Sequence, residues 1–529
     1  MPTDCISYQD SGYFTPLMKD YLDQKENLQS LYNRFPTLEK FKEQLLEKQK
    51  NFDNDNRNVL VSVLKEQYQN IAISDLTNQN IEALKDQNTF TITTGHQLNL
   101  FTGPLYFLYK IISAINLSKE LKAKYPAYSF VPVYWMATED HDFDEINYFN
   151  FNGKKFRWNK ESSGPVGRLS TEGLADLLEV FSLELGSGNN GETIKKLFHD
   201  AYLKHDTLAD ATRFLANSLF GEYGLVILDA DNKDLKKLFI PFIKEELLHQ
   251  TSNKKVLEST EELKNYNVQV NPREINLFYI EDKLRERIIF QNVTYYVNNT
   301  EIKFSEKEIL SELENYPEKF SPNVIMRPLY QEVILPNLCY IGGGGELAYW
   351  LELKSFFNAV NITYPILLLR NSVLLSTQRQ AKKADKLNLT WKDLFMQQTD
   401  LVNEKIKNFS EFQIDFSEQK EFLKEQFENL HTIASKTDKS FSGAVKAQET
   451  KQLKGLENLE KRLLKAEKRK HSEELERITD LQNELFPIKS LQERQTNFSE
   501  FYVANGDLLI QKLFDSLNPL ENTFTIIIL

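Results

Sequence analysis

The chain has 529 residues, which is too long for one ordinary domain and predicts two or three folded units. Hydrophobic residues make up 41% of it, with 36 Phe and 23 Tyr, so a large core can form and wholesale disorder is excluded. The formal net charge is −12, and an acidic chain of this kind is not expected to bind nucleic acid.

The cysteines and the apolar runs indicate where the protein works. Only Cys5 and Cys339 occur, far apart and outside any CxxC unit, so a disulfide framework is not expected and a reducing cytoplasm fits. The N-terminus lacks a basic segment followed by an apolar one, and no run approaches eighteen apolar residues. We therefore expect a cytoplasmic protein that does not span a membrane.

The first half of the chain predicts a βαβ unit. Residues 17–85 have helical spacing of Leu, Phe and Tyr, and residues 89–94 (TFTITT) form a strand pattern. A glycine-containing turn at 95–104 then leads into an apolar helix at 105–124 and a fully apolar strand at 130–137. Strand, turn, helix and strand in this order indicate a parallel sheet with helices on its faces.

The alternation of helix and strand recurs further along. A helix at 207–222, a strand at 224–229, a helix at 234–249 and a strand at 365–370 follow in order. The predicted fold class is therefore α/β, with a parallel-sheet core. In such sheets the ligand crevice lies at the carboxyl ends of the strands.

Two stretches interrupt this alternation, and the chain closes on an apolar tail. Residues 150–200 and 265–300 hold short alternating runs that predict hairpins inserted between the core units as connecting elements. The tail, 524–529, predicts a final buried strand that closes a sheet.

Residues 380–485 differ in composition from the rest. They are rich in Lys, Glu, Gln and Leu, with apolar positions three and four apart, which favours an α-helical coiled coil. A link at 435–443 would let the segment fold back as an antiparallel hairpin. The alternative is two surface helices of the main domain. We prefer an arm, because the segment is too polar to have both faces buried.

The predicted domain organisation follows from this difference in composition along the chain. It comprises a core at 1–379 with N-terminal helices and inserted hairpins, the coiled-coil arm at 380–487, and a C-terminal segment at 488–529 that returns to the core. An exposed apolar seam on such an arm is usually buried against a partner helix, so we expect a homodimer.

The first candidate motif follows the strand at 89–94. A glycine permits a tight turn beside a ligand, Thr102 can cap the next helix, and Pro104 suits its first turn. Free amides at a helix start favour a phosphate or carboxylate. The alternative is a structural turn without a ligand. The candidate ligand-binding residues here are Gly95, His96, Gln97, Thr102, Gly103 and Tyr106.

The second motif, EDHDFDE at 139–145, follows the strand at 130–137. Five acidic residues and one histidine in seven positions repel one another unless a cation or an amine shares them. They could bind a metal, hold a substrate ammonium group or supply a general base. The alternative is a solvated acidic turn. The candidate catalytic residues are Glu139, Asp140, His141 and Asp142.

The third motif combines an arginine with a glycine run, YIGGGGELAYW at 340–350. Four glycines that open a helix allow a ligand to approach backbone amides closely, although a flexible turn has the same composition. The candidate binding residues are Arg327, Gly342, Gly343, Gly345, Glu346 and Trp350, with Arg370 at the end of the strand at 365–370.

Together the three motifs closely resemble the bacillithiol biosynthesis cysteine-adding enzyme family, BshC. The resemblance rests on TGHQLNLFTGPLYFLYKI, VPVYWMATEDHDFDEIN and FSPNVIMRPLYQEVILPNLCYIGGGGELAYWLELK, and it runs through most of the chain. It implies a Rossmann-like core, inserted connecting elements, and a coiled coil that supports dimerisation. It also implies a ligase that joins the carboxyl group of L-cysteine to the amine of glucosaminyl malate. Carboxylate activation makes ATP or another nucleotide the expected cofactor.

For cysteine recognition, the ammonium group would meet Glu139, Asp140 or Asp142. The carboxylate would meet amides at the helix start of 102–106, or Arg327 or Arg370. No metal is predicted, because neither cysteine has a second one nearby. Three alternatives remain: a catalytic zinc on His141 and its neighbouring carboxylates, with or without Cys339; a metal-dependent hydrolase that uses Asp140, His141 and Asp142; and a non-catalytic coiled-coil scaffold.

Overall fold

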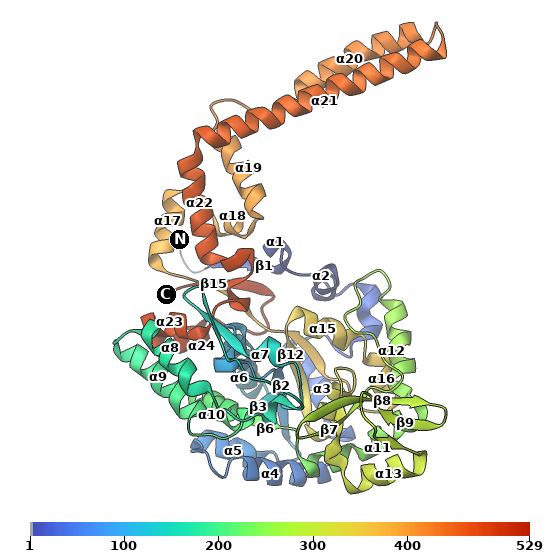
Figure 1. Cartoon of the computed structure of the whole chain (residues 1–529), viewed down its shortest axis with the longest axis vertical. Coiled ribbons are helices and arrows are strands. Elements are labelled where there is room, and N and C mark those ends of the chain that lie inside the picture. The colour runs from blue at the N-terminus through green and yellow to red at the C-terminus, as the bar shows by residue number, and fades with distance from the viewer. Residues whose placement is uncertain (1–3) are drawn as a thin grey trace. The chain divides into compact units, whose positions relative to one another are not determined.

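The computed structural model describes residues 4–529 and divides the chain into two units, which are taken separately (Figure 1). Of the described residues, the larger unit contains 4–375, 490–527 and 529, and the smaller contains 376–489 and 528. No helix among residues 4–529 is both long and apolar enough to cross a bilayer.

A five-stranded parallel sheet in the order β13-β12-β2-β3-β6 forms the centre of the larger unit. Nearly every residue of its strands is buried, as expected where helices cover both faces. The α/β prediction is therefore confirmed. The strands are β2 (Thr89–His96), β3 (Ser129–Met136), β6 (Val226–Asp229), β12 (Asn337–Gly342) and β13 (Ile366–Leu369).

The helices of the larger unit cover this sheet. The apolar helix α6 packs on β2 and β3, α3 packs on β12, and α4 and α5 pack on β6. They include α1 (Tyr8–Ser11), α2 (Pro16–Leu22), α3 (Leu38–Asn51), α4 (Asp55–Gln67), α5 (Asp75–Ala83), α6 (Tyr106–Lys124), α7 (Phe143–Ile146), α10 (Leu208–Phe220), α11 (Lys233–His249), α12 (Thr251–Glu262), α14 (Met326–Ile334), α15 (Gly344–Leu351), α16 (Lys354–Ala359), α23 (Phe498–Asn505) and α24 (Leu508–Ser516).

Two insertions connect the core elements. The second is an antiparallel sheet, as predicted for 265–300, in the order β10-β9-β8-β7-β11. Its elements are β7 (Leu277–Glu281), β8 (Leu284–Gln291), β9 (Thr294–Val297), β10 (Lys303–Phe304), α13 (Glu306–Asn315) and β11 (Phe320–Pro322). The first contains one hairpin, β4 (Tyr148–Phe151) and β5 (Lys154–Arg157), followed by the helices α8 (Leu174–Leu185) and α9 (Asn189–Tyr202).

The prediction of hairpins throughout 150–200 was therefore wrong beyond residue 157. Leu174, Phe181 and Leu185 are buried on α8, and Ile194 and Phe198 are buried on α9. Their spacing of four and seven residues is that of a helix, and it outweighs the short alternating runs. The strand β12 was also missed, although it is an interior strand that pairs with β13 and β2.

A smaller sheet joins the two ends of the described chain. Strand β15 (Thr523–Ile528) pairs in the order β1-β15-β14 with β1 (Asp4–Ser7) and β14 (Ser372–Ser376). The tail is thus a strand, as predicted.

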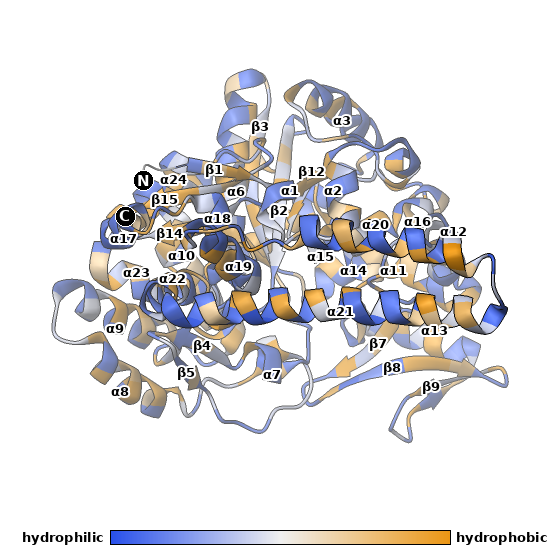
Figure 2. Cartoon of the chain, turned by 90° about the horizontal axis from the view of Figure 1, so that it is seen from above, coloured by the Kyte–Doolittle hydropathy of each residue, from blue (hydrophilic) through white to orange (hydrophobic). Residues whose placement is uncertain are grey.

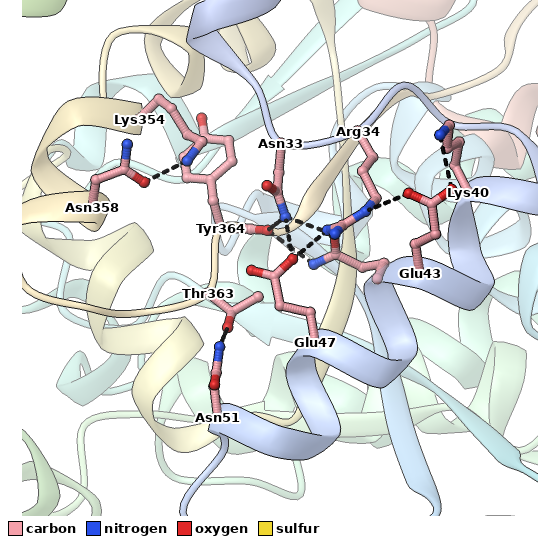
Figure 3. Close-up of polar contacts among 11 residues, drawn as sticks. Asn33, Arg34, Lys40, Glu43, Glu47, Asn51, Lys354, Asn358, Thr363 and Tyr364 are labelled. Carbon is pink, nitrogen blue, oxygen red and sulfur yellow. Dashed lines mark hydrogen bonds and ion pairs between the residues drawn. The ribbon is translucent and has the colours of Figure 1, made fainter.

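The segment before β13 is held by polar contacts from the N-terminal region (Figure 3). Asn33 donates to the Tyr364 carbonyl over 3.3 Å, and Asn51 donates to the Thr363 hydroxyl over 3.1 Å. Arg34 and Glu47 form an ion pair beside them. These contacts position the entry to β13 and leave the opposite, carboxyl end of the strand for the site.

The smaller unit is entirely helical in its described elements. The helices α20 and α21 form an antiparallel hairpin, and Figure 2 shows apolar residues along both. Phe427, Ala434 and Val445 make its small core, while Leu475 and Ile478 of α22 are buried near the base. The helices are α17 (Gln378–Lys386), α18 (Trp391–Phe395), α19 (Gln398–Phe409), α20 (Ser417–Ala434), α21 (Lys439–Lys470) and α22 (Ser472–Leu485).

A buried ion pair joins α3 to α14 in the larger unit. Lys48 Nζ lies 2.9 Å from Glu332 Oε2, and the two side chains are 2% and 0% exposed. Glu332 also accepts hydrogen bonds from Gln331 and Asn337. Loss of one partner would leave the other charge buried without compensation.

We therefore expect Lys48→Met to lower the free energy of unfolding by about 3–5 kcal/mol. The control, Lys40→Met, removes the exposed pair with Glu43 and should change it by less than about 0.5 kcal/mol. Urea denaturation followed by tryptophan fluorescence measures both. Equal effects of the two substitutions would contradict the assigned role of the buried pair.

Candidate functional site

A pocket of about 600 Å³ lies where β2, β3 and β12 end, with the inserted sheet as a further wall. This is the edge at which open α/β sheets bind ligands, and the volume suits a small molecule. It brings together seven of the residues predicted from the sequence: Gly95, His96, Gln97, Glu139, Asp140, Arg327 and Glu346.

His96 closes the end of β2 as a neutral side chain. Burial, followed by the nearby Lys110, holds the pKa of His96 well below its ordinary value. Its ring packs against Tyr106 and Phe107 at centroid distances of 5.3 and 5.1 Å. Its Nε2 is buried and has no hydrogen-bond partner within residues 4–529. A bound ligand can supply that partner.

Beneath His96, a buried lysine ties the glycine run to β2. Lys110 of α6 is 1% exposed, donates to the Gly95 carbonyl over 2.7 Å, and pairs with Glu346 of α15. Glu346 also accepts from Tyr340 Oη over 3.1 Å. Gly95 packs closely against this tyrosine, since a Cβ there would lie 3.1 Å from Tyr340 Oη. The pair thus fixes both turns at one edge of the pocket.

A second buried lysine holds the first residue of the acidic motif. Lys236 of α11 is fully buried, pairs with Glu139, and donates to the Phe320 carbonyl over 2.6 Å. Burial raises the pKa of Glu139 to about 7, against the opposing effect of Lys236. A carboxyl group with such a pKa can take up or release a proton near neutral pH.

Asp140 is the second carboxylate of the pocket and stays ionised. It accepts from Gln97 Nε2 over 3.0 Å and from the His141 amide over 2.7 Å. Burial acts to raise the pKa of Asp140, but these hydrogen bonds and Arg285 outweigh it and hold the pKa well below its usual range. His141 and Asp142 are exposed and do not line the pocket.

The predicted helix-start residues lie below the pocket and do not line it. Asn497 of the C-terminal segment donates to the carbonyls of Phe101 and Gly103 over 2.7 and 2.6 Å. The Leu105 amide donates to the Thr496 carbonyl, so it is not free for a ligand. Thr102 is buried in this turn, and Tyr106 packs against His96.

The remaining glycine-run residues lie around a smaller cavity of about 70 Å³. It is lined by Gly343, Gly345 and Arg370, whose guanidinium is paired with Glu493 at 2.7 Å. Trp350 is buried and stacks on Tyr340 at 4.5 Å. A Cβ at Gly342 would lie 2.9 Å from Glu346 Oε2, so that position supports the lysine pair.

Several residues that line or support the pocket were not predicted from the sequence. Lys110 is the only charged residue in the apolar first half of α6, a signal for a buried and paired charge, whereas Lys236 carries no local signal. Arg285 and Arg287 are separated by one residue in β8, so their side chains lie on the same face of the strand. Arg273 precedes the inserted sheet.

The arrangement of His, Cys, Asp and Glu side chains gives little support to a metal site. Residues 4–529 contain no group of three or more His, Cys, Asp and Glu side chains that could hold a metal ion. Cys339 lies in the apolar core on β12, fully buried, and burial raises the pKa of its thiol well above the ordinary value. It therefore cannot join the exposed His141 in a zinc site.

Known proteins match the chain along its whole length. Residues 1–371 match "Bacillithiol biosynthesis BshC, N-terminal Rossmann-like domain", and residues 373–529 match "Bacillithiol biosynthesis BshC, C-terminal coiled-coil domain". Three relatives bear the name "Putative cysteine ligase BshC". That of Flavobacterium johnsoniae is 72% identical (100% of both chains), that of Christiangramia forsetii 58% (100% of this chain, 99% of the relative), and that of Bacillus cereus 30% (94% and 96%).

The buried carboxyl group of Glu352 holds one loop of the pocket wall in place through hydrogen bonds. Glu352 is 1% exposed and accepts from the amides of Gln269 and Val270 over 2.9 and 3.4 Å. This loop supplies Val270, Asn271 and Arg273 to the pocket wall. Burial raises the pKa of Glu352 from 4.5 to about 7.

Because the folded-state pKa is raised, the folded protein loses stability as pH rises from about 4.5 to 7. Glu352→Gln keeps an acceptor oxygen and removes the buried charge. We expect it to stabilise the protein by roughly 2–3 kcal/mol at pH 8, with a smaller gain at pH 5. Denaturation at both pH values tests this, with Glu66→Gln on the exposed face of α4 as control. A gain that does not depend on pH would refute the explanation.

Proposed function

This chain belongs to the bacillithiol biosynthesis BshC family, and on that premise we propose that it is a ligase for L-cysteine and glucosaminyl malate. The new amide would join the cysteine carboxyl group to the sugar amine. The observation that carries this proposal is the pairing, in one pocket, of a carboxyl group with a pKa of about 7, Glu139, and an ionised one, Asp140.

Activation of the cysteine carboxylate is the first requirement, since a free carboxylate is a poor electrophile. A bound nucleoside triphosphate would supply a better leaving group on the carboxyl carbon. The buried, unpartnered Nε2 of His96 and the closely packed turn at Gly95 fit such a group. These two residues, with the amides that open α15, are the ones that would hold it.

Cysteine binding follows from the charges of the pocket. The ionised Asp140 suits the ammonium group of the amino acid. Arg327 suits its carboxylate, because this guanidinium lies among Trp135, Tyr340 and Trp350, with Cζ 5.6–5.9 Å from the ring centroids. It donates to Tyr349 Oη over 3.3 Å and has no carboxylate in ion-pair range within residues 4–529.

Proton transfer is assigned to Glu139. When the sugar amine attacks the activated carbonyl carbon, the C–N bond forms, the bond to the leaving group breaks, and the nitrogen loses a proton. Glu139 can accept that proton once it is ionised, and Lys236 stabilises the ionised form. Activity should therefore rise through pH 7.

Asp140→Asn tests the site. We expect at least about a hundredfold loss of kcat/KM for cysteine, because the ammonium group loses its counter-charge. The control is Asp142→Asn, whose side chain is exposed and outside the pocket, and which should stay close to wild type. Amide formation from purified components measures both, and thermal denaturation confirms folding. Full activity of Asp140→Asn would remove this residue from the mechanism.

We also propose that the α20–α21 hairpin joins two copies of the chain. The hairpin uses Leu423, Phe427, Ala434 and Val445 for its own packing. Other apolar side chains of the two helices remain exposed, and exposed apolar seams of this kind are covered by partner helices. They are Phe422 (58% exposed), Leu430 (40%), Ile433 (55%), Phe441 (46%) and Leu459 (53%).

The triple substitution Phe422→Glu, Ile433→Glu and Leu459→Glu should convert a dimer to a monomer. A charge-matched control places Glu at the exposed polar positions Gln426, Thr432 and Asn458 and should leave the dimer intact. Sedimentation velocity distinguishes the two. If the triple variant sediments as the wild type does, the hairpin does not form the interface.

A further inference from the structure

Four arginine side chains line the main pocket without a carboxylate partner. Arg273, Arg285 and Arg287 come from the inserted sheet and the loop before it, and Arg327 comes from α14. Within residues 4–529, no carboxylate lies in ion-pair range of any of them. By contrast, Arg168 and Arg370, which lie outside this pocket, pair with Asp231 and Glu493.

The strand β8 presents two of these groups together. Arg285 and Arg287 are two residues apart, so they lie on one face of the strand, about 7 Å from each other along it. Cζ of Arg285 lies 3.9 Å from the ring centroid of Phe278, and its Nη1 contacts His141 Nδ1 at 2.7 Å. Its Nε is buried without a hydrogen-bond partner. The stacking fixes the guanidinium plane while one donor remains available.

The carboxylates of the pocket offset the charge of these arginines only in part, since Asp140 acts on Arg285 without lying in ion-pair range of it. Glu139 and Glu346 are each paired with a buried lysine, and Asp140 accepts from Gln97 and the His141 amide. The pocket lining thus carries four arginines and three carboxylates, and two of these carboxylates, Glu139 and Glu346, are already paired with lysines. Uncompensated cations held close together repel one another, and an anionic ligand relieves that repulsion.

We infer that Arg273, Arg285 and Arg287, here called the arginine face, bind the malyl dicarboxylate of the acceptor. The inference rests on the proposed function. Planar guanidinium groups match carboxylates with two parallel hydrogen bonds, and two side chains spaced along β8 suit two carboxylates on one short carbon chain. An acceptor anchored on the inserted sheet directs its sugar amine toward the strand ends, where Glu139 lies.

Nucleotide phosphates are the other source of a clustered negative charge. Phosphates are commonly held by backbone amides at glycine turns and helix starts, which here belong to β2 and α15. The arginine face belongs to a different wall, the inserted sheet. The observations therefore favour the dicarboxylate on this face.

Calorimetric titration of the full chain with L-malate tests the inference without turnover. We expect wild type and the control Arg477→Gln, an exposed site on α22, to bind malate alike. Arg285→Gln and Arg287→Gln should each weaken binding at least about tenfold, and Arg287→Lys should recover part of the loss. A parallel titration with inorganic tripolyphosphate should be affected much less. Equal malate affinity in all variants, or loss of tripolyphosphate binding alone, would overturn the inference.

Steady-state kinetics separate this inference from the proposed function. For Arg287→Gln and Arg273→Gln, both at exposed positions, KM for glucosaminyl malate should rise at least about tenfold while KM for cysteine changes little. If malate binds through the arginine face but no amide forms, the proposed reaction fails and the subsite stands. If amide forms with an unchanged acceptor KM in both variants, the subsite fails and the reaction stands.

Discussion

A lysine ammonium group can be buried in a protein only when a carboxylate and further acceptors replace its hydration. The larger unit meets this condition twice at one sheet edge, where Lys110 and Lys236 each have a glutamate and a backbone carbonyl. Each pair joins a helix to a turn distant in sequence. One pair fixes the end of β2 relative to the glycine run after β12, and the other fixes the segment after β3 relative to β11.

These two pairs also set the chemical state of the pocket. Lys110 lowers the pKa of His96 beyond the effect of burial, so the ring is neutral. Lys236 opposes the effect of burial on Glu139, whose pKa then lies at about 7. The two glutamates form ion pairs with the lysines, whereas the guanidinium groups of the pocket have no carboxylate in ion-pair range and can bind an anionic ligand. Burial of His96 and Glu139 is thus the larger cause of a neutral imidazole and a titratable carboxyl group, and the two lysines modify its effect.

Local signals predicted much of this architecture, and non-local ones did not. The βαβ unit at 89–137 and the acidic motif could be found because apolar runs and charge density are visible over a few residues. The partners of Glu139 and Glu346 are helix residues 97 and 236 positions away, and no short pattern announces them. The helices α8 and α9 were mistaken for hairpins because short alternating runs were weighed above three-to-four spacing. The strand β12 was missed because its six residues run directly into the glycines.

The charges of the proposed substrates and of the pocket can be compared group by group. Cysteine and glucosaminyl malate together bring three carboxylates and two amines. The pocket offers four guanidinium groups without carboxylate partners, the ionised Asp140, and Glu139 as a proton acceptor. On the proposed assignment, Arg327 and Asp140 hold the amino acid at the strand ends, while the arginine face holds the acceptor on the inserted sheet. The two amines then differ in environment. Beside ionised Asp140 an amine stays protonated, whereas beside Glu139 an amine can lose its proton and attack, so the arrangement itself selects which nitrogen forms the amide.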